Sequence, residues 1–262
     1  MYWLGHETTF YKCTISGNTA YDGGGVFLYD TDSTIQKKFV GYGYADQALL
    51  IQNCTISGNR ADNYGGGLFL YDAEALVKIE NTTITGNSAD WDGAITLYGG
   101  YAELNFCTVA GNTADSYDGA IWVDGYAGIS IKNSIVAGNS SYSGGNDDLT
   151  GSGWFDIEYS LIGGSNSYIN DIQGNLFGVD PQLGPLQDNG GLTETMMPAE
   201  TSPVIDVADP LFVGPPDSDQ RGPGYARIEN DRADMGAVEV GKAKPEFAWN
   251  DFDGDGKSDL PI

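Results

Sequence analysis

A run of aspartates near the C-terminal end of the sequence has the spacing of a calcium-binding loop. It reads Asp251-Phe252-Asp253-Gly254-Asp255-Gly256-Lys257-Ser258-Asp259. Carboxylates at positions 1, 3, 5 and 9, a glycine at position 6 and a backbone carbonyl at position 7 supply hard oxygen ligands around one ion. We predict a Ca²⁺ site in which Asp251, Asp253, Asp255 and Asp259 coordinate by their side chains and Lys257 by its carbonyl oxygen. The alternative is a solvated acidic tail.

Aromatic side chains recur in apolar stretches and predict a binding face. The members of this set are Phe27, Tyr29, Phe69, Tyr71, Tyr98 and Trp122. A row of exposed aromatic rings is unfavourable in water unless something covers it. Three alternatives follow: an insertion or the C-terminal loops cover the rings, the rings pack against another copy or another protein, or they stack on sugar rings.

The other reactive side chains do not combine into a catalytic set, so we predict no catalytic residue. The sequence has a single histidine, His6, which argues against triads and histidine-based zinc sites. Lys132 is the one basic residue in an outward column that also holds Glu80 and Glu158. Three rungs of about 4.8 Å separate these two glutamates, which is too far for a glycosidase pair. A polysaccharide lyase or hydrolase remains the alternative.

The charge of the chain limits its partners. The 262 residues include 37 acidic and 12 basic side chains, which gives a net charge of −25. We therefore expect no nucleic acid partner and no binding to anionic membranes. No apolar run is long enough to span a bilayer, so we also expect no membrane insertion.

The elements that position these residues are sequence repeats. The segment Cys13-Thr14-Ile15-Ser16-Gly17-Asn18 recurs at 54–59, 82–87, 107–112 and 134–139, and a weaker copy begins at Ser160. Each repeat has three short alternating stretches within 25 to 28 residues, apart from an insertion at about 31–49. This periodicity predicts an all-β fold, a parallel β-solenoid of about six rungs.

Stacked rungs assign roles to several columns. We expect Ile15, Ile56, Ile84, Val109 and Val136 to point inward, and the asparagine after each glycine to form a structural ladder along the axis. Cys13, Cys54 and Cys107 share an inward column as buried free thiols, with a bridge between Cys13 and Cys54 as the alternative. Asp62, Asp90 and Asp115 form an acidic column that either solvent or a bridging Ca²⁺ relieves.

The chain also resembles three known families. Residues 8–165 resemble the right-handed parallel β-helix repeats of bacterial surface proteins, including the polymorphic outer-membrane type. The motifs of residues 180–193, 202–206, 219–223 and 234–239 resemble the closing segment of the choice-of-anchor Q domain family. That resemblance implies export and a cell-surface or extracellular location. The aspartate loop resembles the calcium loops of FG-GAP/VCBS repeats.

These observations predict three regions. Residues 1–165 form the β-helix, residues 166–240 form a loop-rich cap that runs back over it, and residues 241–262 begin a calcium-loop module of a longer protein. Arg221 is expected to pin the cap by pairing with Asp219 or Asp234. The predicted function is that of a secreted or surface-located, non-enzymatic structural or adhesive protein that binds calcium and self-associates into a fibre or layer. Other surface proteins or carbohydrate are the further partners expected.

Overall fold

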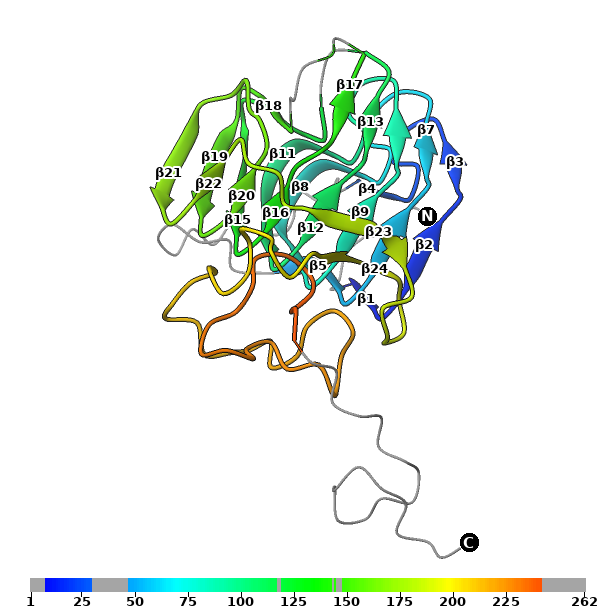
Figure 1. The fold of residues 1–262 in the computed structure, drawn as a ribbon. Coiled ribbons are helices and arrows are strands. Elements are labelled where there is room, and N and C mark those ends of the chain that lie inside the picture. The colour runs from blue at the N-terminus through cyan, green and yellow to red at the C-terminus, as the bar shows by residue number, and fades with distance from the viewer. Residues whose placement is uncertain (1–7, 30–46, 117–118, 143, 145–147, 242–262) are drawn as a thin grey trace, which may run out of the picture.

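The computed structural model describes residues 8–29, 47–116, 119–142, 144 and 148–241. These residues form 24 strands and no helix. Most strands pair in parallel and build three sheets around a common core, while a loop-rich segment lies along one side (Figure 1). The predicted parallel β-solenoid is therefore confirmed.

One sheet has seven strands, each from a successive rung. They carry the repeated Thr-Ile-Ser motif and its variants, and they pair in sequence order: β2 (Thr14–Ser16), β6 (Thr55–Ser57), β9 (Thr83–Thr85), β12 (Thr108–Ala110), β16 (Ile135–Val136), β20 (Leu161–Ile162) and β22 (Leu176–Phe177). The register aligns Ile15 with Ile56, Ile56 with Ile84, and Val109 with Val136. The predicted inward column is therefore in place.

A second sheet has five strands of two residues each. They are β3 (Thr19–Ala20), β7 (Arg60–Ala61), β10 (Ser88–Ala89), β13 (Thr113–Ala114) and β17 (Ser140–Ser141). Ala61, Ala89 and Ala114 are fully buried, so this corner of each rung comes close to the core. Small side chains are needed there because the strands are short and the chain turns sharply on both sides.

The third sheet has ten strands and two parts. The first part contains β1 (Thr8–Tyr11), β5 (Gln47–Gln52), β15 (Ala127–Lys132), β19 (Trp154–Glu158) and β21 (Ile169–Gln173), and the second contains β4 (Val26–Tyr29), β14 (Ile121–Val123) and β18 (Leu149–Gly151). The long strands β8 (Leu68–Glu80) and β11 (Ile95–Asn105) run through both parts. Since β21 and β22 pair in these sheets, the rungs continue past residue 165.

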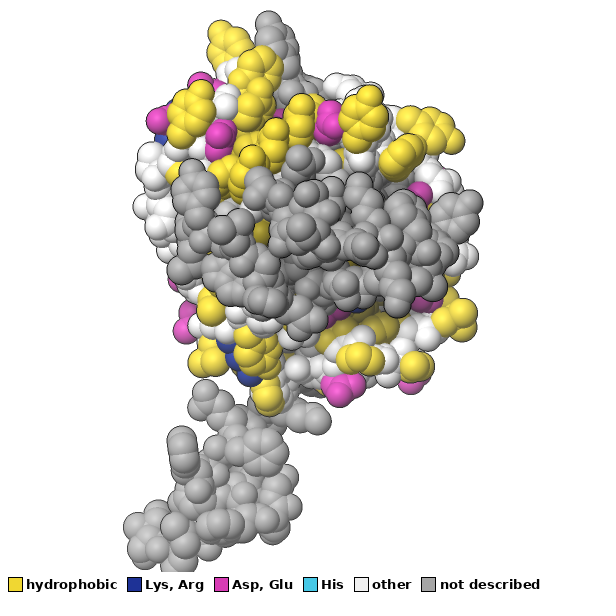
Figure 2. All heavy atoms as spheres, turned by 180° about the vertical axis from the view of Figure 1, so that it is seen from behind, with side chains coloured by type: hydrophobic (Ala, Val, Ile, Leu, Met, Phe, Trp, Pro, Cys, Tyr) yellow, Lys and Arg dark blue, Asp and Glu magenta, His cyan; other side chains and the backbone are white. Residues whose placement is uncertain are grey.

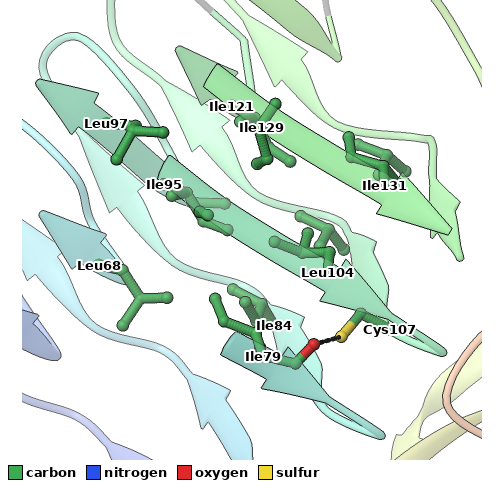
Figure 3. Close-up of a cluster of buried hydrophobic side chains, with 14 of the residues drawn as sticks. Leu68, Ile79, Ile84, Ile95, Leu97, Leu104, Cys107, Ile121, Ile129 and Ile131 are labelled. Atoms are coloured by element: carbon green, nitrogen blue, oxygen red, sulfur yellow. Dashed lines mark hydrogen bonds between the residues drawn. The ribbon is translucent and has the colours of Figure 1, made fainter. Parts of the chain in front are cut away.

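Stacked aliphatic columns fill the interior (Figure 3). Ile56 and Ile84 from the seven-stranded sheet are fully buried, as are Leu68 and Ile95 from the ten-stranded sheet. Each rung contributes only a few such side chains, so burial of apolar area depends on contact between successive rungs. The core is therefore continuous along the axis.

The predicted asparagine ladder runs along one corner of the β-helix. The glycine before each asparagine has a positive φ, which favours glycine; these residues are Gly17, Gly58, Gly86, Gly111 and Gly138. Asn59 Nδ2 donates to Asn87 Oδ1 at 2.9 Å, and the same contact repeats from rung to rung. At the far end, Asn139 Nδ2 donates to Asp148 Oδ1 at 2.8 Å. An aspartate thus replaces asparagine as the last acceptor.

The cysteine column is a second ladder, and its thiols are free. Cys54 N donates to the hydroxyl of Thr82, and Cys107 N donates to the hydroxyl of Ser134. Cys107 Sγ donates to the carbonyl oxygen of Ile79 at 3.2 Å (Figure 3). Free thiols are what the sequence predicted, and the bridge between Cys13 and Cys54 is absent.

The segment after β22 returns along the β-helix and covers the outer face of the seven-stranded sheet (Figure 1). It contains an antiparallel pair, β23 (Leu183–Gln187) and β24 (Thr195–Pro198). We call residues 179–241 the closing segment. The outward side chains that it buries are Thr55, Thr83, Thr108, Ile135 and Leu161. The closing segment therefore runs back along the side of the solenoid, and it begins only after β22.

Polar contacts and a small second core hold the closing segment in place. Gln220 Oε1 accepts from the hydroxyl of Thr83 at 2.6 Å, while Gln220 Nε2 donates to the hydroxyl of Thr55 at 3.0 Å. Phe106 and Met235 lie in the hydrophobic cluster between the two layers. Arg221 pairs with Asp219 at 2.7 Å, as predicted.

Candidate functional site: an aromatic face and a buried acidic cluster

The aromatic residues singled out in the sequence lie together on the second part of the ten-stranded sheet. We call Phe27, Tyr29, Phe69, Tyr71, Tyr98 and Trp122 the aromatic face; they lie on β4, β8, β11 and β14. The parallel register aligns Phe27 with Phe69, and Tyr29 with Tyr71. Tyr71 is in turn aligned with Tyr98. Repeated positions in successive rungs thus become neighbours in space.

The rings of the aromatic face stack on one another. The centroids of Tyr71 and Tyr98 are 5.0 Å apart with nearly parallel planes, and those of Phe27 and Phe69 are 5.2 Å apart. Tyr98 stacks in turn on Trp122 at 6.2 Å. Such contacts fall in the range at which aromatic pairs attract each other, so the face is a preformed, rigid surface.

Exposure varies strongly across this surface. Tyr98 is 43% exposed and Tyr29 is 37% exposed, whereas Phe69 is only 5% exposed. Phe69 is surrounded by the rings of Phe27, Tyr64 and Tyr71. The tyrosines therefore offer the contact area, and Phe69 supports them. Figure 2 shows the molecule from behind, with hydrophobic side chains gathered in groups among acidic ones.

The predicted calcium ligands Asp251, Asp253, Asp255, Lys257 and Asp259 lie outside the residues that the structure describes. The aspartate loop stays a prediction.

The outward polar column contains the charged residues considered above as catalytic candidates. Lys132 Nζ lies 3.1 Å from Glu158 Oε2, and Gln173 donates to the other oxygen of Glu158. The hydrogen bond from Gln173 lowers the pKa of Glu158, whereas burial raises the pKa of Glu80. The register places Glu80 and Glu158 three steps apart, as the sequence predicted.

The side chain of Arg60 relieves the repulsion between two aspartates of the predicted acidic column. Arg60 Nη2 lies 3.2 Å from Asp115 and 3.7 Å from Asp90, and all three side chains are about half exposed. Asp62 is exposed to solvent. This arrangement was missed because Arg60 lies in a different rung from both of its partners.

A buried acidic cluster lies in the closing segment. Asp206, Asp234 and Glu239 each present a carboxylate oxygen, and these oxygens lie within 4.8 Å of one another. Asp234 and Glu239 are almost fully buried. Burial raises the pKa of Asp234 to about 6 and that of Glu239 to about 7. Hard carboxylate oxygens at this separation could hold a metal ion.

Backbone and arginine donors satisfy part of this cluster. Asp234 Oδ1 accepts from Asp206 N at 2.7 Å, and Asp234 Oδ2 accepts from Val240 N at 2.7 Å. Arg227 Nη2 donates to Glu239 Oε2 at 3.2 Å. Within the described residues, Asp206 Oδ1 is buried and accepts no hydrogen bond. Among the described residues, Arg227 is the one arginine that donates to these three carboxylates, so uptake of a proton or binding of a cation would reduce the negative charge that remains.

Comparison with known families identifies the fold. A family model described as the right handed beta helix region matches residues 2–177, about two thirds of the chain. The chain belongs to this right-handed β-helix family. No curated protein and no solved structure matches it.

The region that matches the right-handed β-helix family includes the rungs and ends with the last of them. The match stops at residue 177, where β22 ends, so the closing segment and its acidic cluster lie beyond it. The resemblances to the choice-of-anchor Q closing segment and to the FG-GAP/VCBS loop stay predictions.

Sequence reasoning missed the acidic cluster of this β-helix protein, although its members lie within recognisable motifs. Asp206 ends the motif of residues 202–206, and Asp234 and Glu239 begin and end the motif of residues 234–239. Arg227, which is 1% exposed, was missed as well. Nothing periodic links these residues, so only the path of the loops brings them together.

Proposed function

We propose that this protein is a non-enzymatic structural or adhesive β-helix, exported to the cell surface or the extracellular space, which self-associates through its aromatic face. The observation that supports this most directly is the stack formed by Tyr71, Tyr98 and Trp122. Tyrosine and tryptophan are typical anchors of protein interfaces, because they bury a large area with little loss of side-chain freedom.

The rigidity of the stack also favours an interface. The rings of Tyr29 and Tyr98 are held by neighbours from adjacent rungs, so binding would immobilise few additional rotamers. A partner with a flat apolar surface, such as a second copy of the same face, fits this geometry. Two copies each carry a charge of −25, so we expect association to strengthen as salt screens their repulsion.

Export and calcium binding complete the proposal. The resemblance of residues 180–239 to the choice-of-anchor Q closing segment is the reason for proposing export. Ca²⁺ is the ion that we propose for the aspartate loop of residues 251–259, and the acidic cluster is a second place that could hold it. Within the described part of the chain, no helix is both long and apolar enough to cross a membrane.

The assembly proposal is tested by analytical ultracentrifugation of the full chain at low and high salt. We expect wild-type protein to form oligomers whose population rises with salt, and the variant Tyr98→Ser to shift towards monomer. Tyr126→Ser, which changes a tyrosine that is 89% exposed and outside the aromatic face, is the matched control. Monomeric wild-type protein at every salt concentration would overturn the proposal.

The calcium proposal is tested by melting curves in EDTA and in millimolar Ca²⁺, together with proteolysis of the C-terminal tail. Asp253→Asn reports on the aspartate loop and Asp206→Asn on the acidic cluster. Ca²⁺ bound at either site should raise the melting temperature or protect the tail from proteolysis. If the ion is in the aspartate loop, Asp253→Asn should abolish the effect, and if it is in the acidic cluster, Asp206→Asn should abolish it. Identical behaviour with and without Ca²⁺ would contradict calcium binding at both places.

The absence of catalysis is tested with a panel of neutral and acidic polysaccharides. No release of shorter chains is expected. Cleavage that is lost in Lys132→Ala would replace the structural function with that of a polysaccharide lyase or hydrolase.

A further inference from the structure

A shallow groove of about 350 Å³ lies on the outer surface of the first part of the ten-stranded sheet. Its walls come from β11, β15, β19, β21 and the residue just before β21, and they include Tyr101, Gly128, Trp154, Asp156, Tyr168 and Asn170. None of these residues belongs to the aromatic face, which occupies the second part of the sheet. The groove therefore calls for its own explanation.

The column of aromatic residues along this groove is interrupted by one glycine. The register aligns Tyr101 with Gly128, and Gly128 with Trp154. Phe155 is aligned with Ile169, so the residues just before them, Trp154 and Tyr168, are neighbours. Tyr168 thus continues this column into the next rung. A Cβ at Gly128 would lie 3.1 Å from Cδ2 of Tyr101 and 3.8 Å from Cβ of Trp154. The Tyr101 ring therefore lies against the backbone of Gly128, and no side chain stands between Tyr101 and Trp154.

Two rings of this column, Trp154 and Tyr168, are largely open to solvent. Trp154 is 66% exposed and Tyr168 is 84% exposed. Because they occupy neighbouring rungs of one column, they form a contiguous apolar patch, and such patches mark binding sites more often than single exposed rings do. Their faces carry the negative part of the ring quadrupole, so they attract the C–H groups of a flat, weakly polar ligand.

A polar column runs beside the rings. Ser130, Asp156 and Asn170 are aligned in successive rungs two residues further along the strands. Asn170 Nδ2 donates to Asp156 Oδ1 at 2.8 Å, which fixes the carboxylate and the amide relative to each other. A hydroxyl-bearing ligand on the rings would meet acceptors and donors along this edge.

The charge of the groove selects among such ligands. Asp156 is the charged residue in its lining, and no lysine or arginine is among the residues that line it. Lys132, two residues after Ser130 on β15, pairs with Glu158. An anionic ligand would meet an uncompensated carboxylate here, which argues against uronates and sulfated or phosphorylated sugars.

We propose that this groove binds a neutral saccharide, whose pyranose rings lie against Trp154 and Tyr168 and whose hydroxyls bond to Asp156 and Asn170. A sugar has one face rich in C–H groups and a rim of hydroxyls, which matches an aromatic wall beside a polar column. Successive rungs are about 4.8 Å apart, so the column from Tyr101 to Tyr168 accommodates more than one sugar ring. This binding is independent of self-association through the aromatic face.

The test is affinity electrophoresis of the full chain through gels that contain a neutral β-glucan, mannan or xylan, with polygalacturonate and alginate as acidic probes. We expect at least one neutral polysaccharide to retard the protein, and the acidic ones to have no such effect. In Trp154→Ala and Tyr168→Ala the apparent affinity should fall about tenfold, the loss expected for one stacking ring.

Controls separate this site from general effects. Tyr142→Ala changes a tyrosine that is 86% exposed and outside the groove, and it should leave retardation unchanged. Tyr98→Ser should weaken self-association and leave saccharide binding intact. Circular dichroism and melting curves establish whether each variant is folded. If Trp154→Ala does not fold, Tyr168→Ala alone tests the groove.

Two results would overturn the proposal. One is the absence of retardation by every neutral polysaccharide, and the other is retardation that Trp154→Ala and Tyr168→Ala both retain. Retardation by the acidic probes alone would equally reject a neutral ligand.

Discussion

Removing one amide from the middle of the asparagine ladder should cost far more stability than removing one from its end. Asn87 Oδ1 accepts from both the backbone N and the Nδ2 of Asn59, at 3.0 and 2.9 Å. Asn87 Nδ2 donates to the carbonyl oxygen of Ile56 at 2.9 Å and to Asn112 Oδ1 at 3.0 Å. Asn87→Ala therefore removes four hydrogen bonds at a position that is 1% exposed.

The magnitude follows from what is left behind. A typical hydrogen bond contributes about 1 kcal/mol net, and a buried polar group without a partner costs about 1 to 3 kcal/mol. Some orphaned groups keep another partner, as Asn112 Oδ1 does through the backbone N of Asn87. We therefore expect Asn87→Ala to lower the free energy of unfolding by about 3 to 5 kcal/mol. In a chain of this size that is a melting temperature lower by roughly 10 °C.

Asn18→Ala is the matched control, because the substitution is the same and the site is the exposed first step of the ladder. The side chain of Asn18 makes one bond within the described residues, from its Nδ2 to Asn59 Oδ1 at 2.9 Å. Its loss should cost about 1 kcal/mol or less. Chemical denaturation followed by circular dichroism measures both variants, and hydrogen exchange at Asn59 N reports the local effect. Equal destabilisation by the two substitutions would refute the account of the ladder as a buried network.

Three further predictions concern the closing segment and the core. In EDTA the free energy of unfolding should decrease as pH rises from about 5 to about 8. The folded-state pKa values of Asp234 and Glu239, about 6 and 7, lie above the unfolded values near 4, so the folded protein binds more protons than the unfolded chain in this window. A melting temperature that rises between these pH values would contradict the reasoning. Gln220→Ala removes the hydrogen bonds to three buried threonine hydroxyls, those of Thr55, Thr83 and Thr193. It should therefore lower the free energy of unfolding by about 2 to 4 kcal/mol and expose the closing segment to proteases. Unchanged protease resistance would argue against this anchor. Burial raises the pKa of Cys107 to about 12, so this thiol should react with a disulfide reagent at pH 8 only after unfolding, as mass spectrometry of labelled peptides can show.

The parts of the molecule that the sequence predicts are those set by the repeat period. Ile56 and Ile84 occupy equivalent positions 28 residues apart, so their stacking in the core follows from the alignment of the repeats. The pairing of Arg221 with Asp219 was equally accessible, because the two residues are two positions apart. Local spacing and periodicity need no knowledge of the path of the loops.

The acidic cluster could not be found in this way. Asp206 and Asp234 are 28 residues apart within loops that have no repeat, so their contact depends on how the closing segment folds against the seven-stranded sheet. The groove is an intermediate case. Counting back from the aligned Lys132 and Glu158 gives Gly128 opposite Trp154, so the missing side chain was visible once the register was known.

The three sheets differ in how much of their outer face other parts of the chain bury, and this difference favours a ligand surface on the ten-stranded sheet. The closing segment buries the outward side chains of the seven-stranded sheet, among them Thr83 and Leu161. The five-stranded sheet has strands of two residues, each with a single outward side chain. Among the residues that the structure describes, only the ten-stranded sheet combines long strands with outward aromatic residues, and β11 carries Tyr98 in one part and Tyr101 in the other. Between these residues, Gly99 and Gly100 have positive φ and the register of β11 with β8 shifts. Because the strand changes course there, the aromatic face and the groove lie on different parts of the sheet, and for this reason we propose that each binds independently.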